Sequence, residues 1–152
     1  MSKLQEYNGR FCESEYEYAF ITLLEKEGWQ YLQGNKINRQ TRSDVLYSDD
    51  LENFLSRTNP DWLPDEIHQI MDSVRLVGAE SDFATLHKVY GWMVSGIQFT
   101  PQNGIPRIIS LIDFETPDNN IFRCVNQFAV EYINNGLKET RRPDVLLFVN
   151  GL

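Results

Sequence analysis

Four carboxylates in this sequence have a spacing that could support chemistry. Glu13 and Glu17 stand one helical turn apart, so a helix would present both on the same side. Asp113 ends an apolar run of strand character, and Asp144 precedes another. Carboxylates that converge at strand ends suit a hard cation such as Mg²⁺, which prefers oxygen ligands. Alternatively, these residues have only structural roles: the glutamates are solvated helix residues and Asp113 is a strand-end cap. Residue types alone leave both interpretations open.

Two basic clusters interrupt a chain whose formal net charge is −8. That charge disfavours non-specific binding of nucleic acid, because phosphates are neutralised by Lys and Arg. The first cluster is typical of a solvated loop, whereas the second lies directly before Asp144 and is the candidate for contact with nucleic acid. The clusters are, in order, Lys36, Arg39 and Arg42, and Lys138, Arg141 and Arg142.

The sequence lacks the motifs of several enzyme classes. It contains neither Gly-x-x-x-x-Gly-Lys-Ser/Thr nor Gly-x-Gly-x-x-Gly, so we do not expect this chain to bind a nucleotide phosphate chain. It has no Gly-x-Ser-x-Gly elbow or Cys/His pair for a covalent nucleophile, and its two histidines belong to no zinc-ligand cluster. Cys12 and Cys124 are too few for a disulfide framework, which indicates free thiols in a reducing cytoplasm. No stretch is apolar for long enough to span a membrane.

Helices are expected before residue 97. Residues 14–27 have the periodicity of an amphipathic helix, and residues 29–32 predict a short strand. Three more helices follow, the second opened by Pro64 and closed by Gly78 and the third ending before Gly96. The expected buried faces are Tyr16, Ala19, Phe20, Leu23 and Leu24 in the first helix and Phe83, Leu86, Tyr90 and Met93 in the last.

From residue 97 onward the composition changes to that of β-strands. Residues 105–114, 121–133 and 144–149 are rich in β-branched and aromatic residues, and turn-forming segments separate them. Three strands joined in succession by turns predict an antiparallel meander. Helices followed by a mostly antiparallel sheet give a mixed α/β or α+β fold, and 152 residues suit a single domain.

The last strand is followed by Asn150-Gly151, a strong two-residue hairpin signal because both residues tolerate positive φ. A partner strand would return beside Asp144 only beyond Leu152. We therefore expect the sequence to be a fragment interrupted within a hairpin and incomplete at its C-terminal end. The unpaired edge of the last strand is expected to associate with another copy of the chain.

Six segments match the pattern of one family. They are Glu13-Ser14-Glu15-Tyr16-Glu17, Gly28-Trp29, Leu111-Ile112-Asp113-Phe114, Asn119-Asn120-Ile121-Phe122, Val125-Asn126-Gln127-Phe128 and Arg141-Arg142-Pro143-Asp144-Val145-Leu146-Leu147-Phe148-Val149-Asn150-Gly151. In this order they resemble the N-terminal nuclease region of the R (restriction and motor) subunits of type I restriction enzymes, in the PD-(D/E)xK nuclease superfamily. The resemblance covers nearly the whole chain; its closing segment is highly specific, whereas residues 36–95 add little.

The resemblance implies a restriction-endonuclease-like core in which Asp144 binds a divalent metal, Mg²⁺. A Glu-x-Lys on the returning strand would supply a second carboxylate and a lysine, and Glu17, or next to it Glu13, would join the site from the first helix. Because the sequence contains no such Glu-x-Lys after Gly151, the fragment alone is expected to be inactive. The family's motor domains, which use ATP to translocate DNA, lie outside it. The implied partners are double-stranded DNA and the methylation and specificity subunits.

Two other hypotheses stay open at this point. The second hypothesis is that the chain is a nuclease-like module without catalysis that docks subunits or DNA. The acidic balance of the chain slightly favours this hypothesis. An unrelated α+β domain is the third hypothesis, and the specific closing segment disfavours it. The next ~10–20 residues of the parent protein distinguish the first two, because the hairpin must return there. Asp113, Asn126 and Gln127 match family positions without an assigned role.

Overall fold

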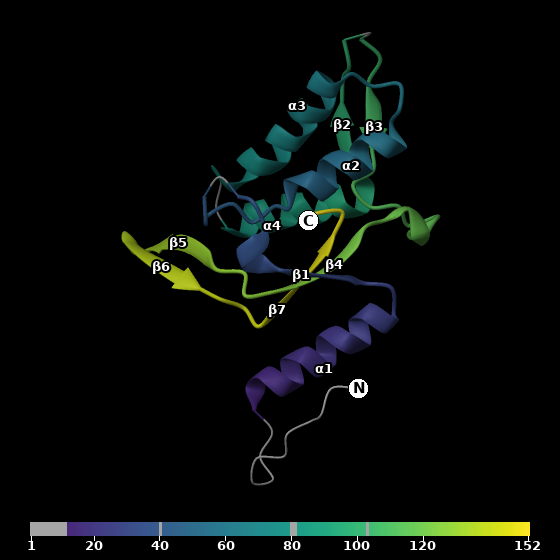
Figure 1. The fold of residues 1–152 in the computed structure, drawn as a ribbon. Coiled ribbons are helices and arrows are strands. Elements are labelled where there is room, and N and C mark those ends of the chain that lie inside the picture. Colours follow the sequence, from purple (N-terminus) through teal and green to yellow (C-terminus); the bar gives the residue numbers. More distant parts are fainter. Residues whose placement is uncertain (1–11, 40, 80–81, 103) are drawn as a thin grey trace. The chain divides into compact units, whose positions relative to one another are not determined.

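The computed structural model describes residues 12–39, 41–79, 82–102 and 104–152. These residues form the mixed α/β fold that the sequence predicts (Figure 1). None of the described helices is long and apolar enough to cross a membrane.

The chain divides into two compact units, each assembled from two separate stretches of sequence. Unit one contains the described residues up to Val45 together with Phe122–Phe148, and unit two contains Leu46–Ile121 together with Val149–Leu152. Most of unit two is therefore inserted into the sequence of unit one. A single domain over the whole chain stays a prediction.

Unit one is built on a three-stranded sheet in the order β1-β4-β7. The strands are β1 (Gln30–Gln33), β4 (Phe122–Asn126) and β7 (Val145–Val149). β1 and β4 run parallel, with Gln30 opposite Arg123. Helix α1 (Glu13–Lys26) precedes β1, and Gly28, with a φ of +94°, allows the chain to turn between them. The buried apolar side chains are Ile21, Ile37, Cys124, Val125, Phe128, Ala129 and Phe148.

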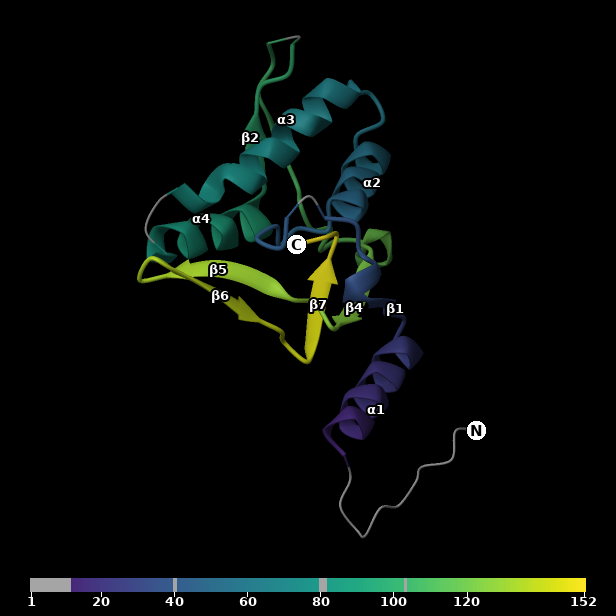
Figure 2. The same ribbon diagram turned by 60° about the vertical axis from the view of Figure 1, so that its left-hand side comes forward.

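A hairpin of unit one leads into β7 (Figure 2). It consists of β5 (Val130–Asn134) and β6 (Leu137–Arg141), paired antiparallel. Asn135 and Gly136 form its turn, with φ values of +49° and +78°, a conformation that an Asn-Gly pair favours.

Unit two packs helices and a second hairpin around one apolar core. The helices are α2 (Ser48–Thr58), α3 (Pro64–Arg75) and α4 (Asp82–Ser95), and strands β2 (Ile97–Phe99) and β3 (Arg107–Ile109) pair antiparallel. The core comprises Leu51, Phe54, Leu55, Ile67, Ile70, Met71, Val74, Ile97, Ile109 and Leu111. The short 3₁₀ helices are η1 (Gly34–Lys36) in unit one and η2 (Leu76–Ala79) and η3 (Pro117–Asn119) in unit two.

The antiparallel meander expected over residues 105–149 is wrong in its pairing. The segment 105–114 contributes only β3, which pairs with β2, and the segment 121–133 is divided into β4 and β5. The division falls at Gln127, whose φ of +56° interrupts the extended backbone. Strand β6 was missed because its residues are mostly polar and lack an apolar alternation.

Two helices expose apolar side chains that the sequence predicts to be buried. In α1 the buried side chain is Ile21, and the expected face points largely to solvent. Periodicity identifies side chains that share a face, but it does not supply the partner that covers them. The exposed side chains are Tyr16, Phe20 and Leu23 of α1 and Phe83, Leu86 and Tyr90 of α4.

The turn predicted at Asn150-Gly151 is confirmed. The two residues have φ values of +54° and +80°. Val149 and Leu152 exchange two backbone hydrogen bonds across them, with N–O distances of 3.2 and 3.1 Å, which is the geometry of a two-residue hairpin turn. Gly151 has no space for a side chain, because a Cβ there would lie 2.1 Å from the carbonyl oxygen of Tyr47.

Candidate functional site

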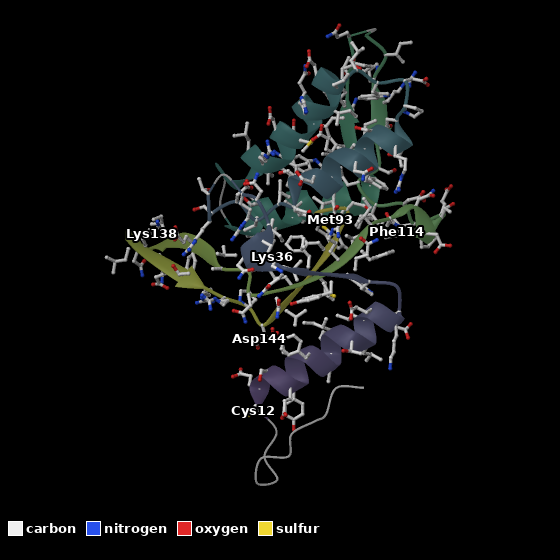
Figure 3. The ribbon with its side chains drawn as sticks, viewed as in Figure 1. Cys12, Lys36, Met93, Phe114, Lys138 and Asp144 are labelled. Carbon is white, nitrogen blue, oxygen red and sulfur yellow. The ribbon has the colours of Figure 1, made fainter. Side chains whose placement is uncertain are left out.

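Asp144 lies at the bend between β6 and β7, where Figure 3 labels it. The residue directly precedes Val145, the first residue of β7, as the sequence predicts. Its carboxylate is exposed and so accessible to a ligand.

The direction of β7 determines which residues lie near Asp144. The backbone N–H of Asn150, just after β7, donates to the carbonyl oxygen of Ile121, just before β4, at 2.8 Å. β4 and β7 are neighbours in the sheet and each contains five residues. The two strands therefore run in opposite directions, and Asp144 lies at the end of the sheet where β4 finishes with Asn126.

Glu17 reaches this same end of the sheet from α1. The Nδ2 amide group of Asn126 donates a hydrogen bond of 2.6 Å to Oε1 of Glu17. The Tyr31 hydroxyl donates to Oδ1 of the same Asn126 at 2.8 Å. Because Asn126 is only 1% exposed, its amide is a fixed support for the glutamate. The structure thus places two of the candidate carboxylates, Glu17 and Asp144, at one end of the sheet of unit one.

The Tyr31 hydroxyl is suited to hold the Asn126 amide in one orientation. Burial raises the pKa of Tyr31, and the nearby Tyr18 and Glu17 raise it further, against the opposing effect of the Asn126 hydrogen bond. The hydroxyl is therefore a neutral donor at physiological pH. By occupying Oδ1 of Asn126, it directs the Nδ2 group toward Glu17. The sequence contains no signal for this chain of three side chains, because it depends on the pairing of β1 with β4.

Glu13, the second candidate on α1, is exposed at the first residue of the helix. The neighbouring Glu15, rather than Glu13, closes the start of the helix by accepting a hydrogen bond from the backbone N–H of Cys12 at 2.9 Å. Of the two glutamates one turn apart, Glu17 is therefore the one that is partly buried and bonded to the end of the sheet.

Asp113 belongs to unit two and lies in the loop between β3 and η3, four residues after the end of β3. Its Oδ1 accepts hydrogen bonds from the backbone N–H groups of Glu115, at 3.1 Å, and Thr116, at 2.9 Å. Its Oδ2 accepts from Nδ2 of Asn119 at 2.8 Å. These donors, Asn119 foremost, lower the pKa of Asp113. The carboxylate therefore stabilises the loop around η3, which is a structural role, although it does not cap the end of a strand as expected.

Asn150 is also structural in unit two. Its side chain is fully buried. Nδ2 donates to the carbonyl oxygen of Leu111 and to Oδ1 of Asn120, both at 2.8 Å, while Oδ1 accepts from the backbone N–H of Ile121 at 2.7 Å. The segments around Asn120 and Asn150, two of the six that resemble the family, therefore contact each other.

The candidate ligands of Mg²⁺ at this end of the sheet are of the right type but are too few. Glu17 and Asp144 provide the oxygen atoms that Mg²⁺ prefers. Among the described residues, no group of three or more His, Cys, Asp or Glu side chains is placed to hold a metal ion. In addition, one oxygen of Glu17 already accepts the Asn126 hydrogen bond.

The three basic residues before Asp144 have different surroundings. Lys138 forms an ion pair of 2.5 Å with Glu131 and thereby lowers the pKa of that carboxylate. The Arg141 guanidinium lies 5.3 Å from the ring centre of Tyr132. Arg142 donates to Oε1 of Gln127 at 3.3 Å. Of the three, Arg142 contacts the residue that directly follows β4.

The fold and this arrangement define the class: a mixed α/β protein with two carboxylates at one end of a three-stranded sheet. The family model described as type I restriction enzyme R protein N terminus matches residues 11–152. The chain therefore belongs to this family, and the resemblance seen in the sequence is confirmed.

Two endonuclease subunits of type I restriction enzymes are similar in sequence to this chain. The chain is 31% identical over an alignment of 147 positions, which covers 90% of its length, to the MjaIXP endonuclease subunit of a type I restriction enzyme in Methanocaldococcus jannaschii. It is 30% identical over 154 positions, covering 92% of its length, to the type I restriction enzyme HindI endonuclease subunit of Haemophilus influenzae. The chain spans 14% of the length of each relative.

Proposed function

We propose that the chain carries the first part of a Mg²⁺-dependent DNA nuclease site within a type I restriction enzyme R subunit. One observation carries the proposal: the buried amide of Asn126 supports Glu17 at the end of the sheet where β7 begins after Asp144. Membership of the R-subunit family supports the choice of reaction, because both relatives above are named endonuclease subunits.

In this proposal Asp144 is the metal ligand, and Glu17 joins the site from α1. Bound Mg²⁺ supplies a Lewis acid that polarises the scissile phosphate and lowers the pKa of a water molecule. Asn126 and Tyr31 keep Glu17 in place. The turn at Asn150-Gly151 reverses the chain, so that in the longer subunit a strand returning beside β7 would add a further carboxylate and a lysine.

The wider assembly is part of the same proposal. Lys138, Arg141 and Arg142 contact double-stranded DNA beside the site. ATP-driven translocation belongs to other regions of the subunit, and methylation and specificity subunits are its partners in the cytoplasm. The 152-residue chain alone is expected to be inactive, because the two carboxylates are too few to retain Mg²⁺ tightly.

The test uses the full-length subunit assembled with its partner subunits. We expect Asp144→Asn to lower the rate of DNA cleavage in Mg²⁺ at least about 100-fold, the scale for loss of one electrostatic catalytic contact. ATP hydrolysis should persist, since it does not use this site. Asp118→Asn, which replaces an exposed aspartate in η3, is the matched control. Cleavage by Asp144→Asn at the wild-type rate would reject the assignment.

A second candidate function is a nuclease-like docking module without catalysis. The acidic balance of the chain, with a net charge of −8, slightly favours it. The same experiment separates the two functions: a docking module predicts unchanged cleavage in Asp144→Asn, with the effect of substitutions confined to binding of DNA or subunits.

A further inference from the structure

A cavity of about 330 Å³ opens on unit one, on the side of η1 and the β5–β6 hairpin. Three arginines line it: Arg39, Arg42 and Arg142. They come from both basic clusters of the sequence, whose members are about a hundred residues apart along the chain. The fold therefore joins into one site two groups of charge that the sequence presents as separate.

The cavity is positively charged although the chain is acidic. No carboxylate occurs among the described residues that line it, and the other polar side chains there are Asn35, Thr41 and Gln127. Glu131 lies nearby and forms an ion pair of 3.7 Å with Arg42. That carboxylate also pairs with Lys138 at 2.5 Å, so its single negative charge is shared between two cations. The carboxylate of Asp44 also lies near Arg39 and acts to raise its pKa. Three arginines against these two carboxylates leave positive charge in the cavity, within a chain of net charge −8.

Arg39 is held in a fixed orientation at the cavity wall. Its two terminal nitrogens donate to the carbonyl oxygens of Asp44, at 3.2 Å, and Ala129, at 2.8 Å. The guanidinium also lies 3.9 Å from the ring centre of Phe128. A guanidinium has five N–H donors, so two bonds to carbonyls leave others for a ligand. Burial lowers the pKa of Arg39, because water solvates its charge less well there, and a bound anion would offset that cost.

Arg142 is oriented by a residue with an unusual backbone conformation. Gln127 has a φ of +56°, which costs free energy for a residue other than glycine. This conformation ends β4 and places the Gln127 side chain at the cavity, where its Oε1 accepts the hydrogen bond from Arg142. Two of the three arginines therefore have hydrogen bonds that hold them at the cavity before any ligand arrives.

We propose that this cavity binds a single phosphate group, recognised by the guanidinium groups of Arg39, Arg42 and Arg142. Guanidinium groups match phosphate oxygens with paired, charge-assisted hydrogen bonds, and the Thr41 hydroxyl adds a neutral donor. The phosphate belongs either to the backbone of a DNA duplex or to a terminal or free phosphate. The choice of DNA rests on the proposed function, whereas the preference for phosphate rests on the cavity alone.

The test measures binding in the absence of divalent metal, so that its result is independent of cleavage. The variants Arg42→Gln and Arg142→Gln, alone and together, replace exposed residues and are less disruptive than substitution of Arg39. Arg75→Gln in unit two is the matched control for loss of one arginine. Circular dichroism confirms that each variant is folded.

Three probes distinguish the sources of phosphate: a fluorescent duplex without terminal phosphate, the same duplex with 5′-phosphates, and inorganic phosphate followed by NMR of the arginine side chains. If the backbone is the source, the double variant binds the unphosphorylated duplex about tenfold more weakly near 0.1 M salt, with a smaller salt dependence, as loss of one phosphate contact predicts. If the source is a terminal or free phosphate, only the other two probes lose binding. Wild-type binding of all three probes by the double variant would overturn the proposal, as would the absence of any phosphate response in the wild-type chain.

Discussion

Asn126 connects two side chains that are far apart in the sequence, Tyr31 and Glu17. The amide is almost fully buried, so its donor and acceptor have no water to replace either partner. A residue that looks like an ordinary strand-end asparagine therefore determines where a candidate catalytic carboxylate is held. Its function is structural support of Glu17 rather than direct chemistry.

We expect Asn126→Leu to lower the free energy of unfolding by about 1–3 kcal/mol, because Glu17 and Tyr31 lose a buried partner. Urea denaturation of the chain measures the change. Tyr31→Phe should also cost about 1–3 kcal/mol, because it leaves Oδ1 of the buried Asn126 without a donor. Asn38→Ala, at an exposed position, is the control. Equal stability of Asn126→Leu and the wild type would contradict the role assigned to Asn126.

Asp113 makes the stability of unit two depend on pH. Its pKa in the folded chain lies below the ordinary 3.8, so its ionised form stabilises the fold above the unfolded pKa. This stabilisation is lost as the pH falls through the folded pKa. We expect Asp113→Asn to lower Tm at pH 7, with the difference from wild type shrinking below about pH 4. Asp61→Asn is the control, and a Tm difference that stays constant down to pH 2 would refute the prediction.

At the scale of elements, the two Asn-Gly turns have similar backbones and different surroundings. Gly136 and Gly151 have φ values of +78° and +80°. A Cβ at Gly136 would meet no atom within 4 Å, whereas one at Gly151 would lie 2.1 Å from the Tyr47 carbonyl oxygen. The N–H of Tyr47 also donates to the carbonyl oxygen of Gly151 at 3.0 Å. The second turn therefore packs against the start of α2, within unit two.

This pair allows a comparison of backbone strain with steric overlap. Gly136→Ala should cost about 1 kcal/mol for the left-handed conformation alone. Gly151→Ala should cost more than about 2–3 kcal/mol, because the Tyr47 backbone must also move. Thermal and urea unfolding of both variants measure the difference. Similar losses in the two variants would show that the close approach at Gly151 is relieved at little cost.

At the scale of the whole molecule, the sequence predicted features that depend on neighbouring residues. The helical segments, the Asn150-Gly151 turn and the position of Asp144 before β7 are examples. Strand pairing was not predictable in the same way, because β1 pairs with β4 across about ninety residues. The partial burial of Glu17 and its bond to Asn126 follow from that pairing. Helical spacing alone therefore proposes Glu13 and Glu17 equally, and only the family resemblance favours Glu17.

The insertion of one unit into another has a consequence for synthesis of the protein. Gln30 pairs with Arg123, and all of Leu46–Ile121 is translated between the two strands that contain them. At about 5–20 residues per second, a ribosome takes roughly 5–20 s to translate the chain from Gln30 to Arg123. During this time β1 has no partner strand, whereas α2 and α3 are adjacent in the sequence and can pack on each other. We therefore expect α2 and α3 to come together in the nascent chain before β1 pairs with β4.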